Sequence, residues 1–383
     1  MDLKEIENTY LLETFSKREI SIERGEGQFL FDSEGKKYLD CMSSIGVMNV
    51  GHCNEYVVKN ITEQLNKITH VNPVFYNSTR AKFLEKFNEI TPECIVKYFF
   101  ANSGTEAVEA AKKFAITTTG KDEFISFKRG FHGKTMGSLS LTHNINYREP
   151  FLNLLDNKTT FCTYNNIEEF KNSVSDKTAG VIIEIVQGNG GVYIVDKKFL
   201  EEVRNICTEK NIVLIFDEIQ SGMGRTGKMF AFEHFGIEPD IFLVSKSIAG
   251  GLPMSLVCMR DYIKIDKELH SGTFNGGPVV CAAGIGVLDY IKDKNLLKHC
   301  EEMGQYLKEK LNTLKSPLIN EIRSIGLMTG IELKQKSGKY VKLMQQKGVI
   351  ATAGGVVIRL LPPLVINKED IDFLIKVLEE VLV

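Results

Sequence analysis

Short apolar runs alternate with longer segments of helical periodicity along the first part of the chain. The apolar runs, each bounded by turn-forming residues, are 97–101, 124–127, 180–186, 212–219 and 241–245. The segments between them include 105–116 and 198–210, where apolar residues recur at helical spacing. This alternation predicts an α/β fold with a largely parallel sheet that helices cover on both faces. Ligands bind such sheets beyond the carboxyl ends of the strands, so functional residues are expected there.

The pattern changes at about residue 285, where long amphipathic helices begin. Two short apolar runs, 325–333 and 355–363, come after the first of these helices, and the segment 368–382 predicts a closing helix. We therefore expect a smaller C-terminal α+β domain at residues 286–383.

The N-terminal residues are expected to form a third unit. Residues 28–40 have the pattern of a β-hairpin that turns at Gly35. A single hairpin is too small to be stable alone. We expect an N-terminal segment, 1–45, that packs with the small domain, and a large domain at 46–285.

Composition and charge exclude several classes of protein. Hydrophobic residues make up 43% of the 383 residues, and the formal charge of −2 arises without a basic tract, so neither nucleic acid nor a membrane is an expected partner. The N-terminus lacks the apolar core of a signal peptide and no apolar stretch approaches the roughly 18 residues of a spanning helix, so a soluble cytoplasmic protein is expected. The eight cysteines are never closer than 12 residues, and no metal site is expected.

Two charged residues stand at the ends of apolar runs. Lys246 lies in VSKSIAGG and Asp217 lies in IVLIFDEIQ. A lysine amine at the mouth of a sheet can form a Schiff base, and an aspartate beside it can keep a heteroaromatic nitrogen protonated. Pyridoxal phosphate requires both groups. Taken one at a time, a solvated lysine and an acidic turn are the alternatives.

The segment FFANSGTEAVEAAKKFA predicts an anion site. Ser103 and Gly104 lie at the junction of a strand and an alanine-rich helix, and Glu106 completes the spacing of a capping box. Free backbone amides and the positive end of the helix dipole bind anions, and a glycine lets a phosphate approach the backbone. An ordinary capped helix is the alternative.

Residues 222–229, GMGRTGKM, match two short nucleotide-binding patterns, GxGxxG and GxxxxGK. The context fits neither pattern. Met229 occupies the position where a P-loop has a magnesium-binding hydroxyl, and DEIQS separates the strand from Gly222. Nucleotide binding nevertheless stays open as a rival function.

Six motifs, taken in order, resemble those of the class III aminotransferases, which are pyridoxal-phosphate enzymes of fold type I. They are NSGTEAVEAAKKFA, FHGKTMGSLSLT, FDEIQSGMGRTGK, SKSIAGGLP, GTFNGGP and IRLLPPLVI. The similarity extends from about Gly25 to the carboxyl terminus and is greatest to the acetylornithine aminotransferases of arginine and lysine biosynthesis.

The resemblance implies a role for each matching residue. Lys246 is the Schiff-base lysine and Asp217 the partner of the pyridine nitrogen. The other cofactor contacts implied are Gly104 and Thr105 at the phosphate beside Ser103, Phe131 and His132 at the ring, Glu184 in support, and Gln220 at the phenolic oxygen. Thr273 reaches the phosphate from the neighbouring subunit, which implies a homodimer with a shared active site. Arg359 binds the α-carboxylate of the substrate, for which a guanidinium fork is suited.

Three substrate contacts depart from the family pattern. Lys134 replaces an arginine that helps to hold the distal carboxylate, and an ammonium cannot reproduce its two-pronged contact. Asn189 replaces a glutamate that masks the carboxylate-binding arginine while ω-amines react, and Gly272 replaces a hydroxyl residue. The implied cofactor contacts are intact.

The sequence therefore predicts an aminotransferase that moves an amino group from N-acetylornithine, or a similar amine-bearing amino acid, to 2-oxoglutarate. The alternatives within the family are ornithine, 4-aminobutyrate or diamine transamination and amino-acid racemisation. A nucleotide-binding protein and a catalytically silent scaffold are the alternatives outside it.

Overall fold

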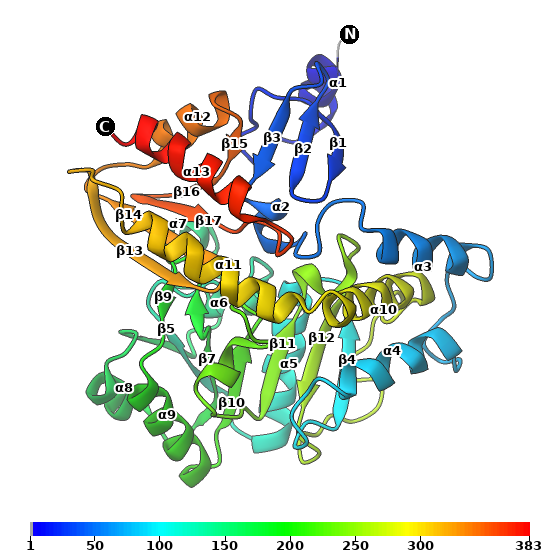
Figure 1. Ribbon diagram of the computed structural model, residues 1–383. Helices are drawn as coiled ribbons and strands as arrows, with labels where there is room; N and C mark the ends of the chain where they lie inside the picture. Colours follow the sequence, from blue (N-terminus) through cyan, green and yellow to red (C-terminus); the bar gives the residue numbers. More distant parts are fainter. Residues whose placement is uncertain (1–2) are drawn as a thin grey trace.

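The computed structural model describes residues 3–383 and is built on a seven-stranded central sheet (Figure 1). In order across the sheet, the strands are β4 (Lys97–Ala101), β12 (Ser255–Met259), β11 (Ile241–Val244), β10 (Val213–Asp217), β7 (Thr178–Ile183), β5 (Glu123–Phe127) and β6 (Thr159–Cys162). All are parallel except β12, which is antiparallel to both of its neighbours. The predicted fold class is confirmed, and each predicted apolar run coincides with or overlaps a strand.

Both faces of this sheet are apolar. Successive strand residues point to opposite sides, and most of the residues on either side are hydrophobic. Along β10, Val213 and Ile215 belong to one hydrophobic cluster, whereas Leu214 and Phe216 belong to the other. Helix α5 (Gly104–Thr119) covers the first face. The second is covered by α8 (Ile167–Ser173), α9 (Lys197–Glu209) and α10 (Pro278–Asp293). Helix α10 also packs against α3 (Glu55–Leu65) and α4 (Ser78–Asn88).

The C-terminal part forms an antiparallel sheet of four strands beneath three helices. The strands, in order, are β13 (Ile319–Ile325), β14 (Met328–Leu333), β17 (Val357–Leu360) and β16 (Thr352–Gly354). The helices are α11 (Leu296–Leu311), α12 (Gly338–Gln346) and α13 (Lys368–Val381).

The predicted hairpin is present and is joined to this C-terminal part. Strands β2 (Phe29–Asp32) and β3 (Lys37–Asp40) pair antiparallel around Gly35, which has φ +81°, and β1 (Ile22–Glu26) pairs with β2. On its other side β3 pairs in parallel with β15 (Val349–Ile350). Figure 1 accordingly shows β15 beside β3.

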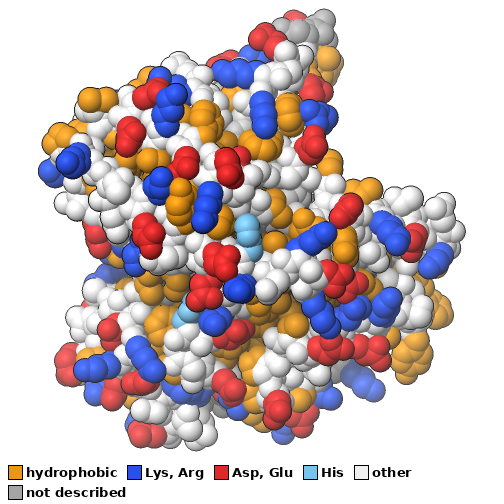
Figure 2. Space-filling view, viewed as in Figure 1, with side chains coloured by type: hydrophobic (Ala, Val, Ile, Leu, Met, Phe, Trp, Pro, Cys, Tyr) orange, Lys and Arg blue, Asp and Glu red, His pale blue; other side chains and the backbone are white. Residues whose placement is uncertain are grey.

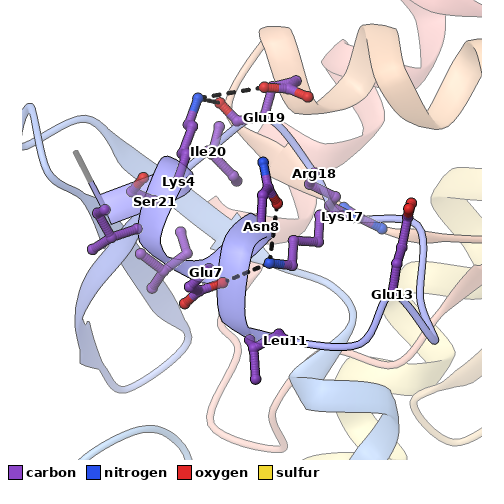
Figure 3. A pocket seen from close by; sticks show the side chains of 12 residues that line it. Lys4, Glu7, Asn8, Leu11, Glu13, Lys17, Arg18, Glu19, Ile20 and Ser21 are labelled. Carbon is purple, nitrogen blue, oxygen red and sulfur yellow. Dashed lines mark hydrogen bonds and ion pairs between the residues drawn. The ribbon is translucent and has the colours of Figure 1, made fainter. Parts of the chain in front are cut away.

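Residues 3–21 form a hook at the N-terminus (Figure 3). Helix α1 (Leu3–Tyr10) has no buried residue, and the following loop folds back so that Lys17 Nζ lies 3.0 Å from Glu7 Oε2. The hook surrounds a cavity of about 560 Å³. Leu12 and Phe15 are 87% and 76% exposed. A single chain therefore leaves the apolar side chains of this segment uncovered.

The surface carries acidic and basic side chains in a mixture, as the face in Figure 2 illustrates, rather than in one block of either sign. Within residues 3–383, no helix combines the length and apolar character needed to cross a bilayer.

The glycine-rich loop 222–229 has a structural role. Arg225 is 0% exposed, and its guanidinium donates hydrogen bonds to the carbonyl oxygens of Leu327 and Pro362 and to the side chain of Asn49. The loop's own amides are used as well, since Gly222, Gly224 and Gly227 each donate to a carbonyl oxygen of the chain. These amides have no hydrogen left for a nucleotide phosphate.

We predict that Arg225→Lys lowers the apparent free energy of unfolding by about 2 to 4 kcal/mol, because an ammonium cannot span the three acceptors and each unpaired buried acceptor costs about 1 to 3 kcal/mol. Urea denaturation followed by circular dichroism measures the change. Arg24→Lys is the matched control, because the Arg24 side chain is exposed and should change stability by less than about 0.5 kcal/mol. Equal effects of the two substitutions would contradict the role given to Arg225.

Candidate active site

A cavity of about 310 Å³ opens at the carboxyl ends of β10 and β11, where the sequence predicts it. Predicted residues that line it are Gly104, Thr105, Phe131, His132, Lys134, Glu184, Asn189, Asp217, Gln220 and Lys246. Three further lining residues, Gly133, Ile219 and Ser245, were not predicted. The glycine and the isoleucine have no chemistry that a sequence motif could reveal.

Asp217 is the last residue of β10 and is only 4% exposed. Its Oδ2 lies 2.7 Å from Nδ1 of His132, and its Oδ1 accepts a hydrogen bond of 3.1 Å from the amide of Ile219. The His132 amide in turn donates to Thr142 Oγ1. These contacts fix the carboxylate at the floor of the cavity and compensate its burial.

Glu184 follows β7 and fixes the loop that carries the aromatic wall. Its two carboxylate oxygens accept hydrogen bonds from the amides of Phe131, at 2.9 Å, and Gly188, at 3.2 Å. Burial raises the pKa of Glu184 to about 7, although the nearby His132 opposes the shift.

Lys246 follows β11 and is the first residue of the 3₁₀ turn η3 (Lys246–Ala249). Its φ of +47° is in the left-handed region, which costs a non-glycine residue about 1–2 kcal/mol. Burial lowers the pKa of its amine, and the carboxylates of Asp217 and Glu184 partly oppose this. A lowered pKa increases the neutral, nucleophilic fraction of a lysine. Strain of this kind is often found at functional sites.

The predicted helix start is confirmed at the other end of the cavity. Ser103 is the N-cap of α5, and its Oγ accepts from the amide of Glu106 at 3.4 Å. Thr105 Oγ1 lies 2.6 Å from Ser138 Oγ. A side chain at Gly133 would come within 2.3 Å of Thr105 Oγ1, so this position has no room for a Cβ. Hydroxyls and a helix N-terminus together form a suitable site for a phosphate.

One buried polar atom in the pocket has no partner. The Gln220 amide nitrogen donates to the Ile45 carbonyl at 3.3 Å, but Gln220 Oε1 is buried without a hydrogen-bond partner among residues 3–383. Buried amide atoms are normally paired, so a missing group is expected here.

The cavity fits pyridoxal phosphate, the cofactor that the resemblance implies. The amine of Lys246 suits its aldehyde, the carboxylate of Asp217 its ring nitrogen, and the start of α5 its phosphate. The Gln220 side-chain NH2 uses one hydrogen for the Ile45 carbonyl and has a second that suits its phenolic oxygen. Within the described residues, no three His, Cys, Asp or Glu side chains are grouped so as to hold a metal ion.

Arg359 comes from the second sheet, on β17, and does not line the cavity itself. It is 6% exposed, and its Nη1 has no hydrogen-bond partner among residues 3–383. Burial lowers its pKa, which the acidic groups of Glu184 and Tyr147 partly restore. The guanidinium therefore lies near the pocket wall with one donor available.

Tyr147 is a further residue of this region that no sequence motif indicated. It lies on the short helix α7 (Ile145–Arg148), and its ring packs edge-to-face on Phe131 with 6.0 Å between centroids. The Nζ of Lys134 lies 4.4 Å from the centre of the same ring.

The structure of one chain does not bring Gly272 and Thr273 to the cavity. Both lie in a largely exposed segment before α10, where a Cβ on Gly272 would come within 2.4 Å of Asn275 Oδ1. The role expected of Thr273 involves a second subunit.

Comparison with known proteins gives concordant matches over nearly the whole chain. A family model described as aminotransferase class-III matches residues 14–382. The acetylornithine aminotransferase of Methanosarcina mazei is 42% identical over 98% of this chain and 94% of its own. The LysW-aminoadipate semialdehyde transaminase of Deinococcus radiodurans is 43% identical over 98% of this chain and 89% of its own.

Among solved structures, an ornithine aminotransferase from Toxoplasma gondii, with pyridoxal phosphate at partial occupancy in its active site, has a TM-score of 0.94. It is 25% identical and covers 99% of this chain and 93% of its own. The family model, the relatives and the fold agree with a pocket that fits the cofactor. The chain belongs to the class III aminotransferases, a family of pyridoxal-phosphate enzymes.

Proposed function

We propose that this enzyme moves the amino group of N-acetylornithine, or of a similar amine-bearing amino acid, to 2-oxoglutarate in a ping-pong cycle. The observation that carries the proposal is the meeting of Lys246 and Asp217 in one cavity, beside the buried guanidinium of Arg359. These groups supply a nucleophilic amine, a fixed negative charge and a carboxylate receptor.

Pyridoxal phosphate, when bound, supplies an electron sink for the pair released as a C–H bond of the substrate breaks. Asp217, held by His132, keeps a negative charge fixed at the cavity floor and stabilises a protonated ring nitrogen. The amine of Lys246 accepts the proton from the amine-bearing carbon of the donor. In the second half-reaction it returns a proton to the carbonyl carbon of the acceptor.

Substrate selection is assigned to Arg359, Lys134, Asn189 and Gly272. Arg359 binds a carboxylate through its available Nη1, and Lys134, at the cavity wall, attracts a second one. The relatives named above act on acetylornithine, LysW-aminoadipate semialdehyde and ornithine, and each of these has an amine or aldehyde far from a carboxylate. Ornithine is therefore the second candidate donor.

The proposal includes a homodimer with a shared active site. Its support is an uncovered apolar patch made by two loops, where Phe75, Tyr76 and Phe274 are 62%, 106% and 66% exposed. Arg80 joins the loops by hydrogen bonds to the carbonyl oxygens of Phe75 and Gly276. Patches of this kind usually mark an interface. Thr273 lies in the loop that carries Phe274, so its hydroxyl would contribute to the active site of a second copy docked on this patch.

A cytoplasmic role in amino-acid biosynthesis, of arginine or lysine, completes the proposal. All eight cysteines are free, as is usual in reducing compartments. The names of the relatives supply the pathway part of the inference.

The function is tested with a panel of donors, N-acetylornithine, ornithine, 4-aminobutyrate and putrescine, each offered with 2-oxoglutarate. We expect glutamate to form fastest with N-acetylornithine or a close analogue. Lys246→Ala should form no glutamate and should lose the pyridoxyl label that borohydride traps on the wild-type chain. Absence of glutamate from every donor, or label on another lysine, would overturn the proposal.

A second prediction concerns the charge at the cavity floor. Asp217→Asn should lower kcat by about a hundredfold or more while cofactor still binds, since one preorganised electrostatic contact is worth about that much. Single-turnover absorbance kinetics measures the loss. The control is Asp240→Asn, which removes another buried carboxylate that pairs with Arg204 away from the cavity. This control should lower stability but not the turnover of the folded enzyme, and near-normal turnover in Asp217→Asn would contradict the assignment.

A third prediction follows from Asn189. The loop that carries it packs on the sheet of Arg359, since a Cβ on Gly191 would lie 3.3 Å from Val357 and one on Gly330 would lie 2.8 Å from the Gly191 oxygen. Asn189→Glu should shift preference towards ω-amines by about 1 to 3 kcal/mol, the range for a charge-assisted contact that masks Arg359. Ratios of kcat/KM for competing donors measure the shift.

Asn189→Gln is the neutral control for this change and should leave the ratio of ω-amine to α-amine donors as it is. If Asn189→Glu also leaves that ratio unchanged, position 189 does not gate Arg359 in this enzyme.

A further inference from the structure

Lys134 and Tyr147 form a cation–π pair at the cavity wall. The Lys134 ammonium lies 4.4 Å from the ring centre of Tyr147, and only Lys134 of the two lines the cavity. Tyr147 is half-buried, whereas Lys134 is exposed. An exposed lysine on a flexible four-carbon stem normally samples many orientations, so a fixed ring beneath it restricts the ammonium.

The ring of Tyr147 is itself well anchored. It packs at 79° to the ring of Phe131, whose amide is held by Glu184. On the other side the Tyr147 amide donates to the Asn144 carbonyl at 3.1 Å, and the Asn144 side chain caps α7. The ring is thus a platform that packs on the aromatic wall of the pocket.

This platform matters because position 134 is a lysine. An arginine binds a carboxylate through a planar fork that sets its own geometry, whereas an ammonium is a point charge with no preferred plane. A lysine that is to bind a particular carboxylate therefore needs its position fixed by something else. In the described structure the ring of Tyr147 meets this need.

We propose that Tyr147 is a positioning residue for substrate selection: its ring holds the Lys134 ammonium where it binds the carboxylate farther from Arg359. The inference rests on the proposed function, in which the substrates include dicarboxylates. Tyr147 acts through Lys134, because Lys134 lines the cavity and Tyr147 does not. It thereby offsets the loss of the arginine fork at position 134.

The test measures the dissociation constants of glutarate and pentanoate for the cofactor-loaded enzyme by isothermal titration calorimetry. The two probes share a five-carbon chain and differ in one carboxylate, so their affinity ratio reports the second carboxylate alone. We expect the wild-type enzyme to favour glutarate. Tyr147→Leu should reduce that preference about threefold to tenfold, the usual range of a partly exposed cation–π contact. The KM for 2-oxoglutarate should rise in proportion while kcat is retained.

Further variants separate the ring from the hydroxyl and from Lys134. Tyr147→Phe keeps the ring and should keep the wild-type ratio. Lys134→Ala should lose the preference, and adding Tyr147→Leu to it should produce no further loss, because residues that act through one another are not additive. Tyr306→Leu removes a similar pair, with Lys310 at 5.1 Å on α11, and should leave the ratio unchanged.

The inference is overturned if folded Tyr147→Leu keeps the wild-type ratio, if Tyr147→Phe loses it, or if the double variant loses more than Lys134→Ala. Equal affinity of the wild-type enzyme for both probes also overturns it. Thermal melting identifies a misfolded variant. If Tyr147→Leu misfolds, Tyr147→Met replaces it, because the flexible methionine side chain can fill the space left by the ring. The proposed function fails separately, through absence of glutamate formation, since the probe ratios require no turnover.

Discussion

A carboxylate buried at the end of a central strand is the constraint on which the rest of the site depends. Asp217 is held by His132 and by the amide of Ile219, because an unpaired charge at such depth would be very costly. The pairing fixes the loop that begins after β5, and the same loop carries Phe131 and Lys134. Glu184 holds this loop a second time through the Phe131 amide. The hydrogen bonds of Asp217 and Glu184 therefore determine the position of the pocket wall.

The second constraint is that the two sheets must meet at a fixed distance. Arg225 provides this joint. It lies in the loop after β10, and its guanidinium donates to the carbonyl oxygens of Leu327, just before β14, and Pro362, just after β17. Its own carbonyl accepts from the Leu327 amide at 3.1 Å. Arg359, on β17, is thereby carried to the pocket wall without lying on the central sheet. A pattern that resembles a nucleotide loop is in fact the joint between two layers.

Local sequence predicted those parts of the site that depend on one segment each. The helix start at Ser103 follows from its cap, and Asp217 and Lys246 follow from apolar runs that end in a charge. Strands β6 and β12 of the central sheet were not predicted from their segments TTFC and SLVCM. The contact of His132 with Asp217 joins residues 85 positions apart, and no local pattern encodes it. No local pattern encodes the contacts of Tyr147 with Phe131 and Lys134 either.

The distribution of departures from the family pattern has a physical reason. Three proposed cofactor contacts, Gly104, Asp217 and Lys246, lie at a helix start and at strand ends, where a changed side chain would also disturb the packing of the central sheet. Lys134 and Asn189 lie instead in exposed loops, and Gly272 lies in a partly exposed one. Loops accept substitutions at low cost in stability. The chemistry is therefore tied to the fold, whereas the choice of substrate can change through residues that the fold does not need.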